Sequence, residues 1–282
     1  DLTVARLADD LFYIVTGTGF RVHDSAWIGD HIPEGLDARL TDVTEAFGTL
    51  SLMGPKARDI LQAVTDDDCS GSAFPFGHVR QITIAGHRVR ALRVTYVGEL
   101  GWELHVPISA TGDVFDALME AGNPYGVRPV GYRALESLRL EKGYRAWSSD
   151  ITPNDTPFDA GLGWAVKLKS DTPFIGRDMA EKAANSVPRK QLAGFTVDDP
   201  DVVLLGRETI LRNGEFAGYL TSGGFGYTIG KPIGYGYVRN DGGVTADYLQ
   251  GGTYELVVAQ ERVPATLHME PLVDPAGARI KA

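Results

Sequence analysis

The segment YVGELGWELHVP, from Tyr96 to Pro107, places the carboxylate of Glu103 between apolar neighbours, where it is either a solvated surface group or a ligand contact. From Leu100 onward apolar residues alternate with Gly101, Glu103 and His105, so these three share one face of a predicted strand. Glu103 is therefore expected to point away from the core, with an open notch beside it at Gly101.

Two interpretations of Glu103 follow from this pattern. An exposed glutamate is most often a solvated surface group. Alternatively, its carboxylate accepts two adjacent N–H groups of a ligand, because a carboxylate binds such a pair in a bidentate way. Tyr96, at the start of the segment, is similarly either a packed aromatic or a stacking surface for a ligand. Alternation alone leaves both choices open.

Basic residues gather in the segment GYRALESLRLEKGYRAW, which has helical spacing of its apolar residues. They are interleaved with Glu136 and Glu141, and comprise Arg133, Arg139, Lys142 and Arg145. One interpretation is a solvated, salt-bridged helix face. The other is a cationic clamp for the anionic tail of a substrate.

Other chemistries are not supported by the motifs. GGFGYTIGKPIGYG resembles a phosphate loop, but Pro232 follows Lys231 where Ser or Thr is required, so turns of a β domain are expected instead. No G-x-S-x-G elbow indicates a serine hydrolase. The six histidines are scattered, none of them paired at i, i+4 spacing beside an acidic residue, so no metal site is expected.

Composition limits the class of protein. The 282 residues carry a net charge of −10, which opposes nonspecific binding to nucleic acid or anionic membranes. No apolar run is long enough to predict a transmembrane helix, and no signal peptide is expected at the start. Cys69 is the only cysteine, which suits a reducing cytoplasm. The sequence lacks an initiator Met, so a fragment or a processed product is expected.

Strands and helices alternate through the first two thirds of the sequence. Two strands joined by an Ala8-Asp9-Asp10 turn are expected within 2–16. Further strands are expected around Thr49–Met53, on either side of the Ala85-Gly86 turn, and in the segment from Tyr96. Helices are expected within 21–33, ending before Pro33, and at 56–64, 112–121 and 131–142, with Thr111 as an N-cap and with Gly122 and Gly143 as stops.

The segment AANSVPRK, residues 183–190, is a predicted boundary, since short apolar runs and many glycines follow it. We therefore expect a separate β-barrel-like domain over 191–282, preceded by an α/β region over 1–185.

Several of these segments together resemble the glycine-cleavage aminomethyltransferase family, which has a folate-binding fold. YVGELGWELHVP is similar to the Y-x-G-E-x-G-x-E strand of that family, and further blocks occur in the same order along nearly the whole chain. These are LMGPKARDIL, GYRALESLRLEKGYRAWSSDITPNDTPFDAGLGWAVKL and GYLTSGGFGYTIGKPIGYGYV. LRLEKGYRAWSSDITPNDTPFDAGL is most similar to the C-terminal folate halves of dimethylglycine and sarcosine oxidases or dehydrogenases. The resemblance implies an α+β fold, a cloverleaf of mixed α/β domains around a central folate channel, with a C-terminal β-barrel-like domain. It also implies that 1–185 is a folate-binding region of two interleaved subdomains whose N-terminal part is missing from this sequence.

The resemblance also implies roles for individual residues. Glu103 matches the glutamate that pairs with the pterin N–H groups, and Tyr96 matches a tyrosine that lines the pterin site. Arg133 matches an arginine associated with the glutamate tail of the folate. Asp1 matches the catalytic aspartate, although the glycines that precede this aspartate in the family are absent here because the sequence begins there.

The function implied is one-carbon transfer to tetrahydrofolate. An iminium or formaldehyde equivalent from demethylation of an N-methylated glycine reacts with the folate amines to form 5,10-methylenetetrahydrofolate. The sequence has no flavin fingerprint, so FAD is expected on an upstream domain or a partner subunit. Two alternatives stay open. One is a folate-dependent methyltransferase or demethylase acting on an amine, ether or sulfonium, and the other is a folate-binding module without turnover.

Overall fold

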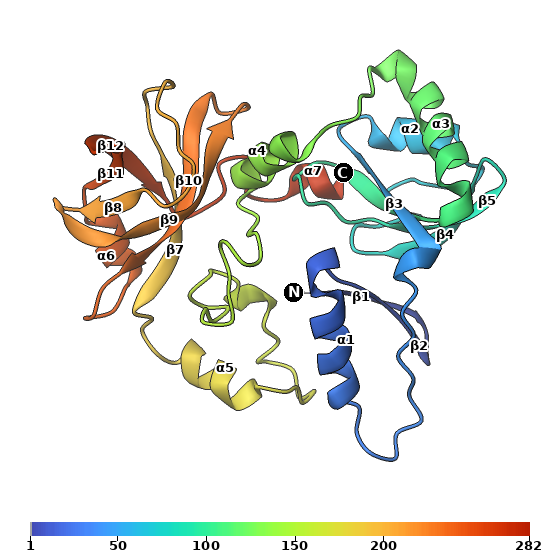
Figure 1. The fold of residues 1–282 in the computed structure, drawn as a ribbon, viewed down its shortest axis with the longest axis horizontal. Helices are drawn as coiled ribbons and strands as arrows, with labels where there is room; N and C mark the ends of the chain where they lie inside the picture. Colours follow the sequence, from blue (N-terminus) through green and yellow to red (C-terminus); the bar gives the residue numbers. More distant parts are fainter. Residues whose placement is uncertain (1) are drawn as a thin grey trace. The chain divides into compact units, whose positions relative to one another are not determined.

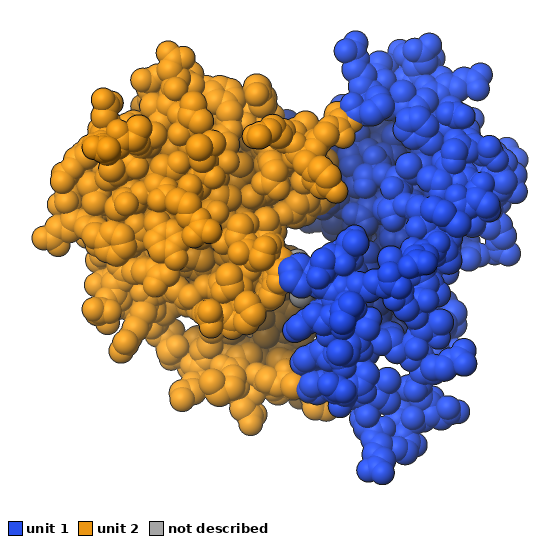
Figure 2. Space-filling model, in the orientation of Figure 1, with its two compact units in different colours: residues 1–95, 99–129, 277–282 blue, residues 96–98, 130–276 orange. Residues whose placement is uncertain are grey.

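A computed structural model describes residues 2–282 as two compact units, each of which is considered by itself (Figure 2). The first unit runs up to Thr95 and includes 99–129 and 277–282, whereas the second contains 96–98 and 130–276. The sequence predicted domains over 1–185 and 191–282, which divide the chain differently from these two units. Those domain limits stay a prediction.

The first unit is built on a sheet of strand order β3-β6-β5-β4, with a separate hairpin of β1 and β2 (Figure 1). Its strands are β1 (Thr3–Ala8), β2 (Leu11–Val15), β3 (Phe47–Met53), β4 (Val79–Ile84), β5 (His87–Leu92) and β6 (Gly101–Pro107). Its α-helices are α1 (Arg21–Asp30), α2 (Ala57–Ala63), α3 (Thr111–Gly122) and α7 (Ala278–Lys281), and short 3-10 turns cover 18–20, 44–46 and 108–110, with a further one at 123–125.

One face of this sheet forms the core of the first unit. Helix α3 contacts β3 and β6, and α2 contacts β6 and α3. The core cluster of this unit includes the fully buried side chains of Phe74, Trp102 and Leu104. The turn between β4 and β5 follows from its residues, because Ala85 and Gly86 both have positive φ, as a two-residue hairpin loop requires. The predicted Ala85-Gly86 turn is therefore confirmed.

Two local predictions in the first unit are wrong. Thr111 is the first residue of α3 rather than its N-cap, because a 3-10 turn leads directly into the helix and the Thr111 hydroxyl donates back to the carbonyl of Pro107. The strand expected from Tyr96 begins only at Gly101, because Gly98 has φ +74° and the chain turns there.

The second unit contains a closed barrel of strand order β10-β7-β12-β11-β8-β9 (Figure 1). Closure pairs every strand on both sides and leaves no open sheet edge. The strands are β7 (Lys190–Thr196), β8 (Thr209–Arg212), β9 (Glu215–Gly226), β10 (Lys231–Arg239), β11 (Tyr254–Val258) and β12 (Glu261–His268). The α-helices are α4 (Tyr132–Lys142), α5 (Arg177–Ala184) and α6 (Ala246–Gln250), and a 3-10 turn covers 163–165.

The helix α4 ends at Gly143 as predicted. Gly143 has φ +71°, and its N–H donates to the carbonyl of Leu140 while the N–H of Tyr144 donates to that of Arg139. These paired bonds are those of a Schellman motif, which needs a left-handed residue at this point. Leu140 then packs with Ile233 and Tyr235 on the outer side of the barrel.

The predicted α+β fold with a C-terminal barrel is confirmed by this architecture. The segment GGFGYTIGKPIGYG forms the end of β9, a turn and most of β10, so its glycines belong to a β-hairpin as expected. Of the helices in residues 2–282, none combines the length and apolar character needed to cross a bilayer.

Candidate functional site

Glu103 lies on β6, between Ser51 of β3 and Leu92 of β5. Its neighbours Trp102 and Leu104 are fully buried on the core face of the sheet. Glu103 is on the opposite face, where 27% of its side chain is exposed. The alternation predicted from the sequence is therefore confirmed, and it places the carboxylate outside the core.

The expectation of an open notch at Gly101 is wrong, because β3 fills that space. A Cβ added to Gly101 would lie 2.3 Å from Sδ of Met53 and 2.4 Å from the carbonyl oxygen of Leu52. The space is therefore filled by β3, whose Met53 is directly opposite Gly101 in the sheet. Glycine is needed here for the close approach of two strands and not for ligand access.

The carboxylate of Glu103 has no hydrogen-bond donor among the described residues. Nε2 of His105 lies 3.8 Å from Oε2 of Glu103. A partly exposed carboxylate with both oxygens free can accept two N–H groups from one ligand. The Glu103 carboxylate is therefore open to a ligand that presents two adjacent N–H groups.

Tyr96 is half-buried within the second unit, where two contacts fix its ring. Its hydroxyl donates to the carbonyl of Arg145 at 3.1 Å, and its ring is parallel to that of Tyr144, with centroids 6.0 Å apart. Burial raises the pKa of the Tyr96 phenol above its ordinary value. Tyr96 is thus a rigid, neutral aromatic surface.

Arg133 is exposed in the first turn of α4 and forms no ion pair with any described residue. It is the one residue of the four predicted basic side chains with a free guanidinium in the described part of the chain. Its position leaves it available for an anionic group.

The other three basic residues of this segment are not available to a ligand. Arg139 and Lys142 are buried, and Lys142 pairs with Asp274 at 2.9 Å. Arg145 donates to the carbonyls of Gly143 and Ala160. The interpretation of this group as a solvated helix face is therefore wrong, because the second unit uses three of the four side chains internally. Of the predicted cationic clamp, only Arg133 remains free among the described residues.

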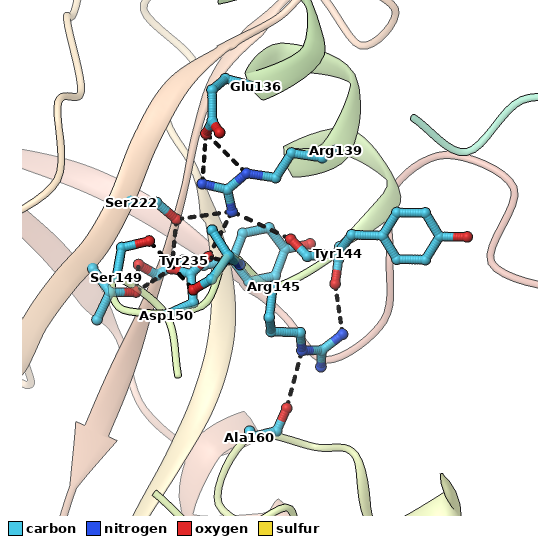
Figure 3. A network of polar contacts seen from close by, with 12 residues as sticks. Glu136, Arg139, Tyr144, Arg145, Ser149, Asp150, Ala160, Ser222 and Tyr235 are labelled. Carbon is cyan, nitrogen blue, oxygen red and sulfur yellow. Dashed lines mark hydrogen bonds and ion pairs between the residues drawn. The ribbon is translucent and has the colours of Figure 1, made fainter. Parts of the chain in front are cut away.

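Arg139 is the centre of a polar network that attaches α4 to the barrel (Figure 3). Its guanidinium lies 2.6 Å from Asp150 and 2.7 Å from Glu136, and the hydroxyl of Ser222 donates to Asp150 at 2.7 Å. Burial opposes the charge on Arg139, but the two carboxylates outweigh it and hold the pKa of Arg139 above its usual value. Sequence reasoning missed Asp150, because no spacing links it to Ser222.

A cavity of about 620 Å³ lies elsewhere in the second unit, between the start of β7 and the end of β10. Its lining includes Phe158, Asp159, Arg189 and Arg239, and none of the residues predicted from the sequence. No cluster of three or more potential metal ligands occurs in residues 2–282.

The predicted site residues are distributed over both units. Glu103 belongs to the first unit, and Tyr96 and Arg133 belong to the second. Asp1 lies outside the described residues. The assignments of all four residues to a folate site stay predictions.

Comparisons with known proteins cover almost the whole chain. The family model described as the GCVT N-terminal domain matches residues 1–170, and the glycine cleavage T-protein C-terminal barrel domain matches residues 190–274. The solved structure of the glycine cleavage system aminomethyltransferase T from Bartonella henselae superposes with a TM-score of 0.82 at 26% identity. That match covers 97% of this chain and 72% of the other.

Among curated proteins, mitochondrial sarcosine dehydrogenase of Mus musculus is 40% identical over all of this chain and 32% of its own length. Mitochondrial dimethylglycine dehydrogenase of Mus musculus is 35% identical, again over all of this chain and 32% of its own length. This chain thus spans about a third of these relatives. The resemblance drawn from the sequence is confirmed.

Replacing Asp150 with Ala is expected to destabilise the second unit. The change leaves Arg139 charged and buried without its closest partner, which typically costs about 3–5 kcal/mol. Denaturant unfolding followed by tryptophan fluorescence measures the loss. The control is Asp198→Ala, which removes an exposed partner of Lys231 and is expected to leave the unfolding midpoint nearly unchanged. Equal shifts for the two variants would contradict the role of the network.

Proposed function

This chain belongs to the glycine cleavage T-protein family, and on that premise we propose that it binds tetrahydrofolate and transfers a one-carbon unit to it. The observation that carries the proposal is the free, partly exposed carboxylate of Glu103 on the strand that bears the family's motif. Tetrahydrofolate supplies two amine nitrogens, between which the one-carbon unit becomes a methylene bridge.

The one-carbon unit comes from an N-methylated glycine. The names of the relatives support this substrate class, since one is a sarcosine dehydrogenase and another a dimethylglycine dehydrogenase. In our proposal the amine is oxidised to an iminium or formaldehyde equivalent by an FAD-containing domain or partner, which the greater length of these relatives accommodates. A cytoplasmic location remains a prediction, whereas these two relatives are named as mitochondrial enzymes.

Each predicted residue has a separate task in the proposal. Glu103 accepts two N–H groups of the pterin and so fixes its orientation. Tyr96 presents a neutral ring to the pterin, and Arg133 pairs with the carboxylates of the glutamate tail. The carboxylate of Asp1 accepts a proton from the reacting nitrogen and stabilises positive charge in the transition state.

Replacing Glu103 with Gln is expected to weaken tetrahydrofolate binding by about 10- to 100-fold. The amide has one acceptor oxygen and no charge, whereas each hydrogen bond to a charged group contributes about 1.5–3 kcal/mol. Calorimetric titration of the native enzyme measures the affinity. Glu99→Gln is the matched control in the same motif, since Glu99 pairs with Arg279, and its affinity is expected within about twofold of the wild type. Unchanged affinity in Glu103→Gln would remove Glu103 from the site.

Replacing Arg133 with Ala is expected to weaken binding of a triglutamate folate about threefold to fivefold more than binding of the monoglutamate. An exposed arginine contributes up to about 1 kcal/mol to an ion pair, and longer tails offer more carboxylates. The two titrations are repeated with Arg189→Ala, another exposed arginine of the second unit. Equal losses for both ligands would exclude a tail-binding role for Arg133.

Replacing Asp1 with Asn in the native enzyme is expected to lower the rate of methylenetetrahydrofolate formation by about 10²- to 10⁴-fold, the usual contribution of general acid–base catalysis. Folate affinity is expected to change little, because the role concerns proton transfer. Asp9→Asn, in the exposed turn of the β1–β2 hairpin, is the control. Full turnover in Asp1→Asn would refute the catalytic role and favour another base.

A further inference from the structure

A row of polar side chains crosses the sheet face that carries Glu103. His105 follows Glu103 on the same face of β6, and Arg90 of β5 is its cross-strand partner. From the β1–β2 hairpin, Tyr13 reaches this face and places its hydroxyl 2.9 Å from Nδ1 of His105. The guanidinium carbon of Arg90 lies 4.0 Å from the centre of the Tyr13 ring. All four residues belong to the first unit.

His105 has one ring nitrogen without a hydrogen-bond partner in residues 2–282. Its side chain is only 5% exposed, and the unpartnered atom is Nε2, the nitrogen nearest Glu103. Leaving a buried polar atom unpaired typically costs about 1–3 kcal/mol. Such an atom calls for an explanation, and the carboxylate 3.8 Å away is the group that can supply one.

The carboxylate of Glu103 determines which ring nitrogen of His105 carries the hydrogen. An ionised carboxylate only accepts hydrogen bonds, so the nitrogen facing Glu103 must carry the hydrogen. In the uncharged imidazole Nδ1 is then an acceptor, and the hydroxyl of Tyr13 donates to it. The ring of Tyr13 is itself held by the cation of Arg90 over its face and by Phe47 at its edge.

The separation of 3.8 Å exceeds a hydrogen bond, and Glu103 is free to move because no other described residue donates to it. A small rotation of its side chain brings Oε2 within reach of Nε2–H. In that position Oε1 and the second lone pair of Oε2 remain available to a ligand with two N–H groups.

We propose that His105 is a positioning residue that holds the carboxylate of Glu103 in place. This inference rests on the proposed binding of folate by Glu103. The Nε2–H of His105 holds Oε2 of Glu103, and the hydroxyl of Tyr13 selects the tautomer that makes this possible. Neither Tyr13 nor His105 contacts the ligand. Their effect on affinity passes through Glu103 alone, which separates this role from direct binding.

The test compares two replacements of His105 in the native enzyme by calorimetric titration with tetrahydrofolate. His105→Gln places an amide N–H near the position of Nε2, whereas His105→Asn reaches only as far as Nδ1. We expect His105→Asn to weaken binding about tenfold and His105→Gln to stay within about twofold of the wild type, since one hydrogen bond to a charged group is lost or kept. Tyr13→Phe keeps the ring under Arg90 but removes the hydroxyl that selects the tautomer of His105. We expect this change to weaken tetrahydrofolate binding about threefold.

A double-mutant cycle then distinguishes positioning from structural damage. With Glu103→Gln already present, His105→Asn is expected to cause no further loss of affinity, because its effect is mediated by the carboxylate. Thermal unfolding of each variant measures any loss of stability, which a purely structural role would produce in both backgrounds. Equal losses of affinity in both backgrounds, or no loss in His105→Asn, would overturn the proposal.

The two hypotheses fail in different ways. If Glu103→Gln itself leaves folate affinity unchanged, the proposed function of Glu103 fails and the positioning role fails with it. If Glu103→Gln weakens binding but His105→Asn and Tyr13→Phe do not, only the positioning role is refuted.

Discussion

The ion pair between Arg139 and Asp150 is the interaction on which the arrangement of the second unit depends. Both side chains are almost completely buried, and their charges are compensated because they face each other at 2.6 Å, with Glu136 beside Arg139 and further donors around Asp150. Such a pair adds little net stability compared with apolar packing, but it tolerates only one geometry. It therefore fixes how α4 lies against β9 and, after Gly143, where Tyr144 and its stacking partner Tyr96 are placed.

Two further buried charges on α4, Glu141 and Lys142, are also compensated by specific partners. Glu141 accepts hydrogen bonds from the backbone N–H groups of Thr228 and Ile229 in the β9–β10 turn, and Lys142 pairs with Asp274. A helix that buries charged side chains in this way needs a specific partner for each of them. In the basic segment 131–147, Arg133 is therefore the only described basic residue that is free to bind an anionic ligand.

The first unit obeys a different constraint, the period of two along a central strand. Burial of Trp102 and Leu104 against the helices forces Glu103 and His105 onto the opposite face. On that face Tyr13 covers His105, while Glu103 keeps about a quarter of its side chain exposed. The sheet thus supplies a rigid base for a carboxylate that pairs with no lysine or arginine among residues 2–282.

Local patterns were sufficient to predict most elements, because hairpin turns, helix ends and strand alternation depend on residues near in sequence. They predicted the Ala85-Gly86 turn and the helix end at Gly143, and they directed attention to Glu103. They failed at Gly101 and Thr111, where the outcome depends on a neighbouring strand or on the preceding turn. A glycine that opens space and a glycine that lets a strand approach look alike in a sequence.

The sequence by itself determined which face of β6 carries Glu103, the family of the chain, and the α+β character of its fold. It could do so because periodicity and motif order depend on residues that are close together in the sequence. Only the tertiary structure decided which charges are free. Arg139 and Lys142 are removed from water by partners distant in sequence, Asp150 and Asp274, and Met53 fills the space beside Gly101. Long-range contacts set burial and charge compensation, and no local spacing encodes them.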